Sequence, residues 1–323
     1  MPITGTTSYP SVINSFLQHW EDASGQLAPA VLTIVGGKTR ADLDTERGTL
    51  EGRRDAVTDS QIERGLQRAL LNGRIAGLQA RVVEFNERVR ADLPGSAYAR
   101  VLPDAFAIGD GEQAVRDCLR AILKVWDLIN TMPVPPAGIA LPLILRESYP
   151  VADFDAQRVE LRTAYKELAD LDVQLNFYRA RRNEQQDLIY EMLKNYRLKV
   201  AASFAPAHPI VATLPALTPP DGHTPAPVAA QAVWDVPGTQ AKVTWEASAD
   251  PDLVSYQIRG VPGDEYDSND EVLVATVDPA DPREVLTDFA LNTPGITAGF
   301  KVYVVLDTGR EAGSVARFVT RPV

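Results

Sequence analysis

Residue types that usually build catalytic and metal sites are scarce in this chain. Its 323 residues include one cysteine, Cys118, and three histidines, His19, His208 and His223. A lone cysteine cannot form a disulfide within the chain, so the fold must be stable through packing alone. The histidines lack the spacing of metal ligands, and no nucleophile stands beside a base. We therefore expect no metal site and no cofactor, and we predict that the protein is not an enzyme.

Long apolar runs are missing as well. The most apolar stretch covers residues 133–145 and is broken by prolines, whereas a helix needs about 20 apolar residues to span a bilayer. The first residues carry neither the basic start nor the apolar run of a secretory signal. We expect a soluble, leaderless protein without a membrane span, located in the cytoplasm or in a released particle or appendage.

Positive charge is scarce in the last third of the chain. From Asp221 onward there are 16 acidic and 7 basic residues, a net charge of −9, while 27 acidic and 25 basic residues precede it. An acidic surface repels nucleic acid, so nucleic acid is an unfavourable partner. The nearly balanced first part can pair its arginines and carboxylates between its own helices.

Two motifs resemble ligand sites but lack the required spacing. Residues 36–39 read Gly-Gly-Lys-Thr after an apolar run, yet the first glycine of a phosphate-binding loop would have to stand at Leu32. The acidic turn at residues 263–271 offers many oxygen ligands but not the regular order of a calcium loop. A glycine turn and a solvated acidic turn are the simpler interpretations, and calcium binding at the second stays an open alternative.

Apolar residues at helical spacing predict an all-α region before the acidic third. A short helix is expected around residues 12–20 with Ser11 as its N-cap, then an extended run at 30–35. A thin apolar stripe from Arg40 leads into a stronger seam that ends at Leu93. That seam consists of Leu71, Ile75, Leu78, Val82, Phe85 and Val89. A helix is predicted at 112–130, followed by an extended crossover at 132–150.

The longest predicted helix starts near Val151 and meets no proline or glycine until after Phe204. At 1.5 Å per residue it would extend roughly 75 Å. Its heptad column is interrupted once, at Arg182, within a polar block at residues 179–187. This block is either a solvated or salt-bridged crossing, or a contact where its charges meet carboxylates of a neighbouring subunit.

From residue 228 the apolar period changes to two, and short strands alternate with Pro, Gly and Asp clusters. Strands are predicted at 241–246, 253–260, 272–277, 300–306 and 316–320, which indicates a β-sandwich. Trp245 lies on the second strand, and residues 250–258 read Asp-Pro-Asp-Leu-Val-Ser-Tyr-Gln-Ile. A late strand at 300–309 ends in a glycine turn and is followed by Ser314.

In these features the last third resembles a fibronectin type III domain. The resemblance implies a binding or spacing module and carries no catalytic residue over. One position departs from the family, because Phe300 stands where the family has a tyrosine on this strand. The hydroxyl bond at that corner would then be missing unless Tyr303 replaces it. The helical two thirds resemble no family that we recognise.

Together these patterns predict a multidomain α + β chain: an elongated, antiparallel, coiled-coil-like helical bundle followed by a fibronectin type III-like β-sandwich. The predicted boundaries are 1–204 for the bundle, 205–227 for a proline-rich hinge, and 228–323 for the sandwich. A helix near 50 residues cannot be covered by an average compact domain, so it must protrude, pair with an equally long helix, or pack in an assembly.

We therefore expect a non-catalytic, self-assembling subunit of a filament, tube or phage/tail-like particle, with the acidic sandwich displayed outward. Its partners would be copies of itself, with other assembly proteins as further candidates. The residues predicted to make subunit contacts, unless they are core of their own chain, are Leu161, Leu168, Arg179, Arg182, Ile189 and Tyr196.

The alternative is a surface-recognition module for a polysaccharide or a protein, carried on a helical stalk. Sugar binding would need exposed aromatic side chains on one face. Trp234, Tyr256 and Tyr266 are the candidates.

Overall fold

The computed structural model describes residues 2–107, 109–136 and 139–322. The predicted outer limits at 1 and 323 lie outside this range. The chain divides into two compact units, one made of Met1–Gly65 and Val173–Val323, the other of Leu66–Asp172. Two long helices take part in both units, which is why the division does not follow the predicted order of bundle, hinge and sandwich.

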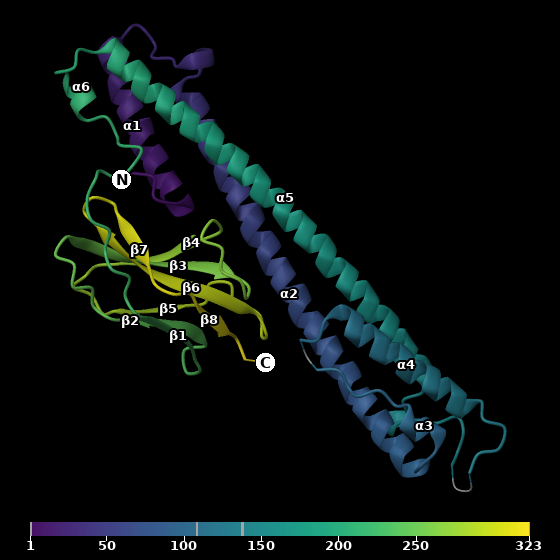
Figure 1. The fold of residues 1–323 in the computed structure, drawn as a ribbon. Coiled ribbons are helices and arrows are strands. Elements are labelled where there is room, and N and C mark those ends of the chain that lie inside the picture. Colours follow the sequence, from purple (N-terminus) through teal and green to yellow (C-terminus); the bar gives the residue numbers. More distant parts are fainter. Residues whose placement is uncertain (1, 108, 137–138, 323) are drawn as a thin grey trace. The chain divides into compact units, whose positions relative to one another are not determined.

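Helices build the first two thirds of the chain, as predicted (Figure 1). Both α2 and α5 are 53 residues long, so the thin stripe after Arg40 and the seam up to Leu93 belong to one helix. The helices are α1 (Tyr9–Leu27), α2 (Arg40–Asp92), α3 (Ala97–Arg100), α4 (Glu112–Asn130), α5 (Val151–Ser203) and α6 (Pro209–Ala212), with 3-10 turns η1 (Thr6–Ser8), η2 (Val35–Gly37) and η3 (Arg146–Ser148). No helix of the described residues has the length and apolarity needed to cross a membrane.

The unit 66–172 has a core formed by the seam of α2, the apolar face of α4 and the start of α5. Phe85 and Trp126 stack with ring centroids 4.8 Å apart, and Phe154 packs against Trp126 at 5.7 Å. The indole nitrogen of Trp126 donates to the carbonyl of Leu143, so the proline-rich crossover also closes this core. These are the residues that the helical periodicity selected.

In the other unit, α1 lies beside the C-terminal part of α5 (Figure 1). Trp20 stacks on Tyr196 at 4.5 Å. The ring of His19 is buried between the Tyr196 hydroxyl, 2.6 Å from Nδ1, and the Ile210 carbonyl, 2.8 Å from Nε2. A carbonyl oxygen only accepts, so Nε2 carries a proton, and a neutral ring then accepts the tyrosine proton at Nδ1.

The β-sandwich consists of two antiparallel sheets. One has the strand order β1-β2-β5, and the other has the order β4-β3-β6-β7, with β8 also pairing with β6. The strands are β1 (Ala230–Asp235), β2 (Gln240–Trp245), β3 (Leu253–Pro262), β4 (Val272–Val277), β5 (Glu284–Thr287), β6 (Thr297–Leu306), β7 (Glu311–Gly313) and β8 (Arg317–Thr320). Trp245, Tyr256 and Phe300 are buried between the sheets, so the predicted fold class is confirmed.

The predicted hinge at 205–227 is held along its length. It contains α6, whose Ile210 is buried against α1 and α5. The carbonyl of Leu217 accepts from the Ile3 backbone N–H at 2.9 Å. Further along, the Pro220 carbonyl accepts from Arg310 of the sandwich at 3.0 Å. Backbone groups of this segment therefore bond to the N-terminal segment and to the sandwich.

Several local predictions were wrong. The first helix begins at Tyr9, two residues before the predicted cap at Ser11, because Pro10 fits the first turn of a helix. By contrast, the run at 30–35 is non-helical up to Ile34, which is extended, although it joins no sheet and Val35 begins η2; Leu32 and Ile34 are buried in the core of α1 and α5. Strands β1, β5 and β7 were not predicted, because β5 and β7 have only four and three residues and β1 lacks a clean alternation.

Candidate functional site

The polar block of α5 meets the sandwich at Asp270, two residues before β4. Arg179 donates from Nε at 2.7 Å and again from Nη2 to one carboxylate oxygen, and Arg182 donates to the other at 2.5 Å. Gln61 of α2 adds a bond of 2.9 Å. The side chain of Asp270 is fully buried and that of Arg182 is 3% exposed. These charge-assisted bonds hold the sandwich to both long helices.

The next residue, Glu271, points the other way into a second buried cluster. Its carboxylate receives the Tyr303 hydroxyl and lies 3.4 Å from Arg259. Arg259 also binds Glu311 through bonds of 2.8 and 2.5 Å and covers the Tyr303 ring at 4.0 Å. Burial, together with the Glu271 carboxylate, raises the pKa of Tyr303. Tyr303 therefore serves this cluster, and Phe300 packs in the core without any corner bond.

These two clusters decide the interpretation of the acidic turn at 263–271. Asp270 and Glu271 are both about 4% exposed, and both are paired with arginines of the same chain. Their oxygens accept bonds from arginine, glutamine and tyrosine side chains, so they are not free to ligate calcium. The predicted solvated turn is therefore wrong for these two residues: Asp270 docks on the helices and Glu271 bonds within the sandwich. Calcium binding by the rest of the turn stays a prediction.

The structure places the six predicted contact residues within their own chain. Leu161 is buried in the core of the unit 66–172, and Leu168 packs partly buried against it. Ile189 and Tyr196 are fully buried beside α1. Arg179 and Arg182 bind Asp270, as described above. Contacts within one chain therefore account for all six side chains, and subunit contacts through them stay a prediction.

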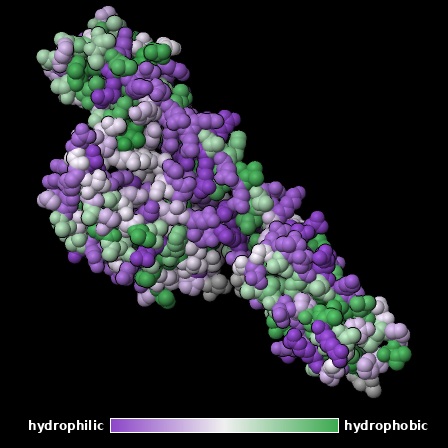
Figure 2. Space-filling view, viewed as in Figure 1, coloured by the Kyte–Doolittle hydropathy of each residue, from purple (hydrophilic) through white to green (hydrophobic). Residues whose placement is uncertain are grey.

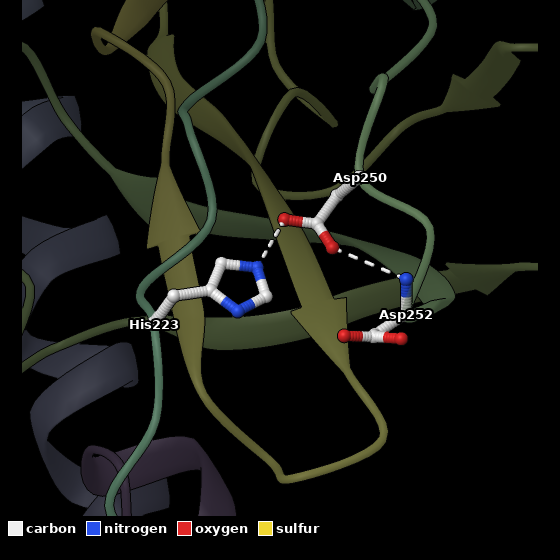
Figure 3. Close-up of side chains that lie close together, drawn as sticks. All are labelled: His223, Asp250 and Asp252. Atoms are coloured by element: carbon white, nitrogen blue, oxygen red, sulfur yellow. Dashed lines mark hydrogen bonds and ion pairs between the residues drawn. The ribbon is translucent and has the colours of Figure 1, made fainter.

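His223, Asp250 and Asp252 bring their ligand atoms within 4.8 Å of one another (Figure 3). Nε2 of His223 lies 2.7 Å from the Asp250 carboxylate, whose other oxygen accepts from the Asp252 backbone N–H at 3.2 Å. The hydrogen bond to Asp250 raises the pKa of His223, and the same bond lowers the pKa of Asp250. The arrangement is a hydrogen-bonded pair of an exposed histidine from the predicted hinge and a largely buried aspartate of the sandwich, and it ties these two segments together.

A groove of about 630 Å³ opens on the sheet that contains β3, β4 and β6. Ser255, Gln257 and Arg259 line it, and they alternate along β3 with the core residues Tyr256 and Ile258. The groove therefore lies on the face of the sheet that points away from the sandwich core.

The opposite wall of this groove comes from the start of the chain and from α2. Residues 2–8, which we call the N-terminal strap, reach the sandwich through a bond of 3.5 Å between Thr6 and the Ser268 carbonyl. Pro2 lies so close to Gly309 that a Cβ there would meet its Cδ at 2.7 Å. Arg54 of α2 completes the wall.

The sequence signalled only part of these sites. It singled out the arginines of α5 and the acidic turn, but not that the two meet. Nothing in its pattern marked Gln61, Arg54 or Arg259, because single polar residues in helical or alternating segments normally face water.

Comparisons with known proteins give a limited picture. No protein-family model and no curated protein matches the sequence. Among solved structures, a Fn3-like protein from Clostridium thermocellum is similar over 31% of this chain and 97% of its own, with 21% identity and a TM-score of 0.25.

Two pectate lyases are also similar over part of their length. PelI from Erwinia chrysanthemi has 15% identity and a TM-score of 0.24, over 29% of this chain and 28% of its own. Pel3 from Pectobacterium carotovorum has 11% identity and a TM-score of 0.24, over 29% of this chain and 27% of its own. This chain thus spans less than a third of either lyase. The C-terminal part is a β-sandwich by its own strand order.

Proposed function

We propose that this protein is a non-catalytic structural subunit that assembles with copies of itself through its helices, as in a filament, tube or phage/tail-like particle. The observation that supports this best is a pair of exposed apolar side chains one turn apart on α5. Val173 is 71% exposed and Phe177 is 54% exposed. Burying such side chains fully contributes about 1.5–3 kcal/mol each.

The chain's own buried charges also favour a structural role. The clusters around Asp270 and Arg259 are satisfied within the chain and hold one part of the fold to another. On the face drawn in Figure 2, hydrophobic residues are scattered among hydrophilic ones over the helices as well as the sandwich.

The recognition alternative has less support. Tyr256 is buried, while Trp234 and Tyr266 are half-buried beneath the cations Arg321 and Lys301. Among the described residues, Tyr256 is therefore inaccessible, and a cation lies over the ring of each of the other two aromatics, whereas sugar stacking needs an open ring face.

Sedimentation velocity of the full chain over a wide concentration range tests the proposal. For the unchanged protein, we expect the fraction of species larger than a monomer to increase with protein concentration. The double variant Val173→Gln/Phe177→Gln, which keeps good helix formers, should remain monomeric. Val315→Gln, which removes an equally exposed valine between β7 and β8, is the control and should behave as the unchanged protein. A monomer at every concentration, or unchanged assembly of the double variant, would contradict the proposal.

A further inference from the structure

The groove beside the N-terminal strap contains a cation, Arg54, that is not bonded directly to an anion among the described residues. Arg54 lines the groove, and among the described residues none forms a hydrogen bond or an ion pair with its guanidinium. Burial and the like charge of Arg182 lower the pKa of Arg54, while the smaller effects of Asp55 and Glu51 on the same helix raise it. A guanidinium stays charged in proteins, so this half-buried charge is left without a carboxylate bonded directly to it.

The carboxylates near Arg54 do not bond to it. Asp55 and Glu51 lie on the same helix, are exposed, and act on Arg54 only through space. Asp270 is fully used by Arg179 and Arg182. Glu311 lines the same groove, but both of its oxygens accept from Arg259. Arg179 and Arg182 are therefore paired with Asp270, and neither Asp270 nor Glu311 bonds to Arg54.

A second polar group in the groove is also unsatisfied. The hydroxyl oxygen of Thr7 is buried and has no hydrogen-bond partner among the described residues. Leaving such a group unpaired is unfavourable. Thr7 belongs to the N-terminal strap, which lines the groove together with Arg54. A ligand oxygen in the groove would compensate both groups.

The sheet wall of the groove has a different character. Val254 on β3 is 53% exposed and Leu273 on β4 is 44% exposed, and Val272 and Val305 line the groove beside them. These aliphatic side chains offer an apolar surface facing the polar wall. The volume falls within the range of small-molecule sites, which combine an apolar lining with few convergent polar groups.

We infer that this groove binds a small amphipathic carboxylate, with the anionic head at Arg54 and Thr7 and a short aliphatic tail against Val254 and Leu273. A carboxylate matches the planar fork of a guanidinium through two parallel hydrogen bonds. The head neutralises the unpaired charge, and the tail covers the exposed aliphatic side chains. This site goes beyond the structural role proposed above and does not depend on it.

Calorimetry with hexanoate as the probe tests this inference on the full chain. We expect saturable binding to the unchanged protein, at least tenfold weaker binding to Arg54→Gln, and unchanged binding to Arg53→Gln. Arg53 is a matched control, because it neighbours Arg54 in sequence but donates to the Arg181 carbonyl and does not line the groove. Leu273→Asn tests the tail and should also weaken binding of hexanoate.

Two further probes separate the head from the tail. Hexan-1-ol has the tail without the charge, and inorganic phosphate has charge without a tail, so both should bind at least tenfold more weakly than hexanoate. Equal binding of hexan-1-ol, equal binding of phosphate, no binding of hexanoate, or unchanged binding to Arg54→Gln would each overturn the inference. Circular dichroism of every variant establishes that it is folded.

Discussion

Replacing Asp270 by alanine is the most informative perturbation of this fold, because one carboxylate holds the sandwich to two helices. The change removes the acceptor of Arg179, Arg182 and Gln61 at once. Removing one partner of a buried ion pair costs about 3–5 kcal/mol, since the remaining charge stays buried and unpaired. Arg182 is 3% exposed and cannot reach water, but Arg179 is 29% exposed and can recover part of its hydration.

We therefore expect a loss of about 3 kcal/mol, at the lower end of that range. Because each 1.4 kcal/mol is a factor of ten, opening of the contact should become about a hundredfold more frequent. Hydrogen exchange followed by mass spectrometry measures this directly at residues 267–271. The amide of Asp270 is bonded to the Asp267 carbonyl at 3.0 Å and reports opening of the turn.

The buried sandwich core provides an internal reference in this experiment, because its strands should keep their protection while the turn opens. Asp270→Asn keeps the shape and one acceptor oxygen, so its effect should be smaller. Asp281→Ala, an exposed aspartate in the loop before β5, is the matched control and should exchange as the unchanged protein. If residues 267–271 exchange their amide hydrogens at the same rate in Asp270→Ala as in Asp281→Ala, the reasoning is refuted.

Three further outcomes are expected. Tyr196→Phe should lower the free energy of unfolding in urea by about 1–3 kcal/mol, because it leaves Nδ1 of the buried His19 without its partner; an unchanged midpoint would contradict this. The pKa of His223 is raised by Asp250. The stabilising interaction between His223 of the predicted hinge and Asp250 of the sandwich should therefore be fully present below about pH 6.5 and weaken as pH rises through the pKa of His223 in the folded protein. Proton NMR titration should show that rise, and Asp250→Asn should abolish it. Burial raises the pKa of Cys118, so this thiol should react with a disulfide reagent only when the protein unfolds, and rapid labelling of the native chain would count against its buried position.

Helical elements were predictable from sequence because their cores are amphipathic and local. The seam from Leu71 to Val89 and the face of the helix at 112–130 are buried as the 3.6-residue period indicates. The continuity of α2 was less evident, since its first part has one apolar residue in every two turns. Its few apolar contacts, among them Ile62 against the sandwich core, appear only in the folded chain.

The candidate sites were much less predictable, for a physical reason. Asp270 and Arg182 are 88 residues apart, and a charge in a polar block looks the same whether it faces water or a buried partner. The sequence thus contains both residues of the ion pair but does not indicate that they contact each other. Arg54 carried no signal at all, because its lack of a partner depends on how the strap and the sheet enclose it.

Photo-cross-linking from α5 tests the proposed assembly most directly. Benzoylphenylalanine in place of Phe177 would react with whatever covers this exposed position in solution. The account predicts cross-links between two copies of the chain, mapped by mass spectrometry to helical residues and becoming more abundant with concentration. Cross-links confined to a single chain, or none at any concentration, would contradict it.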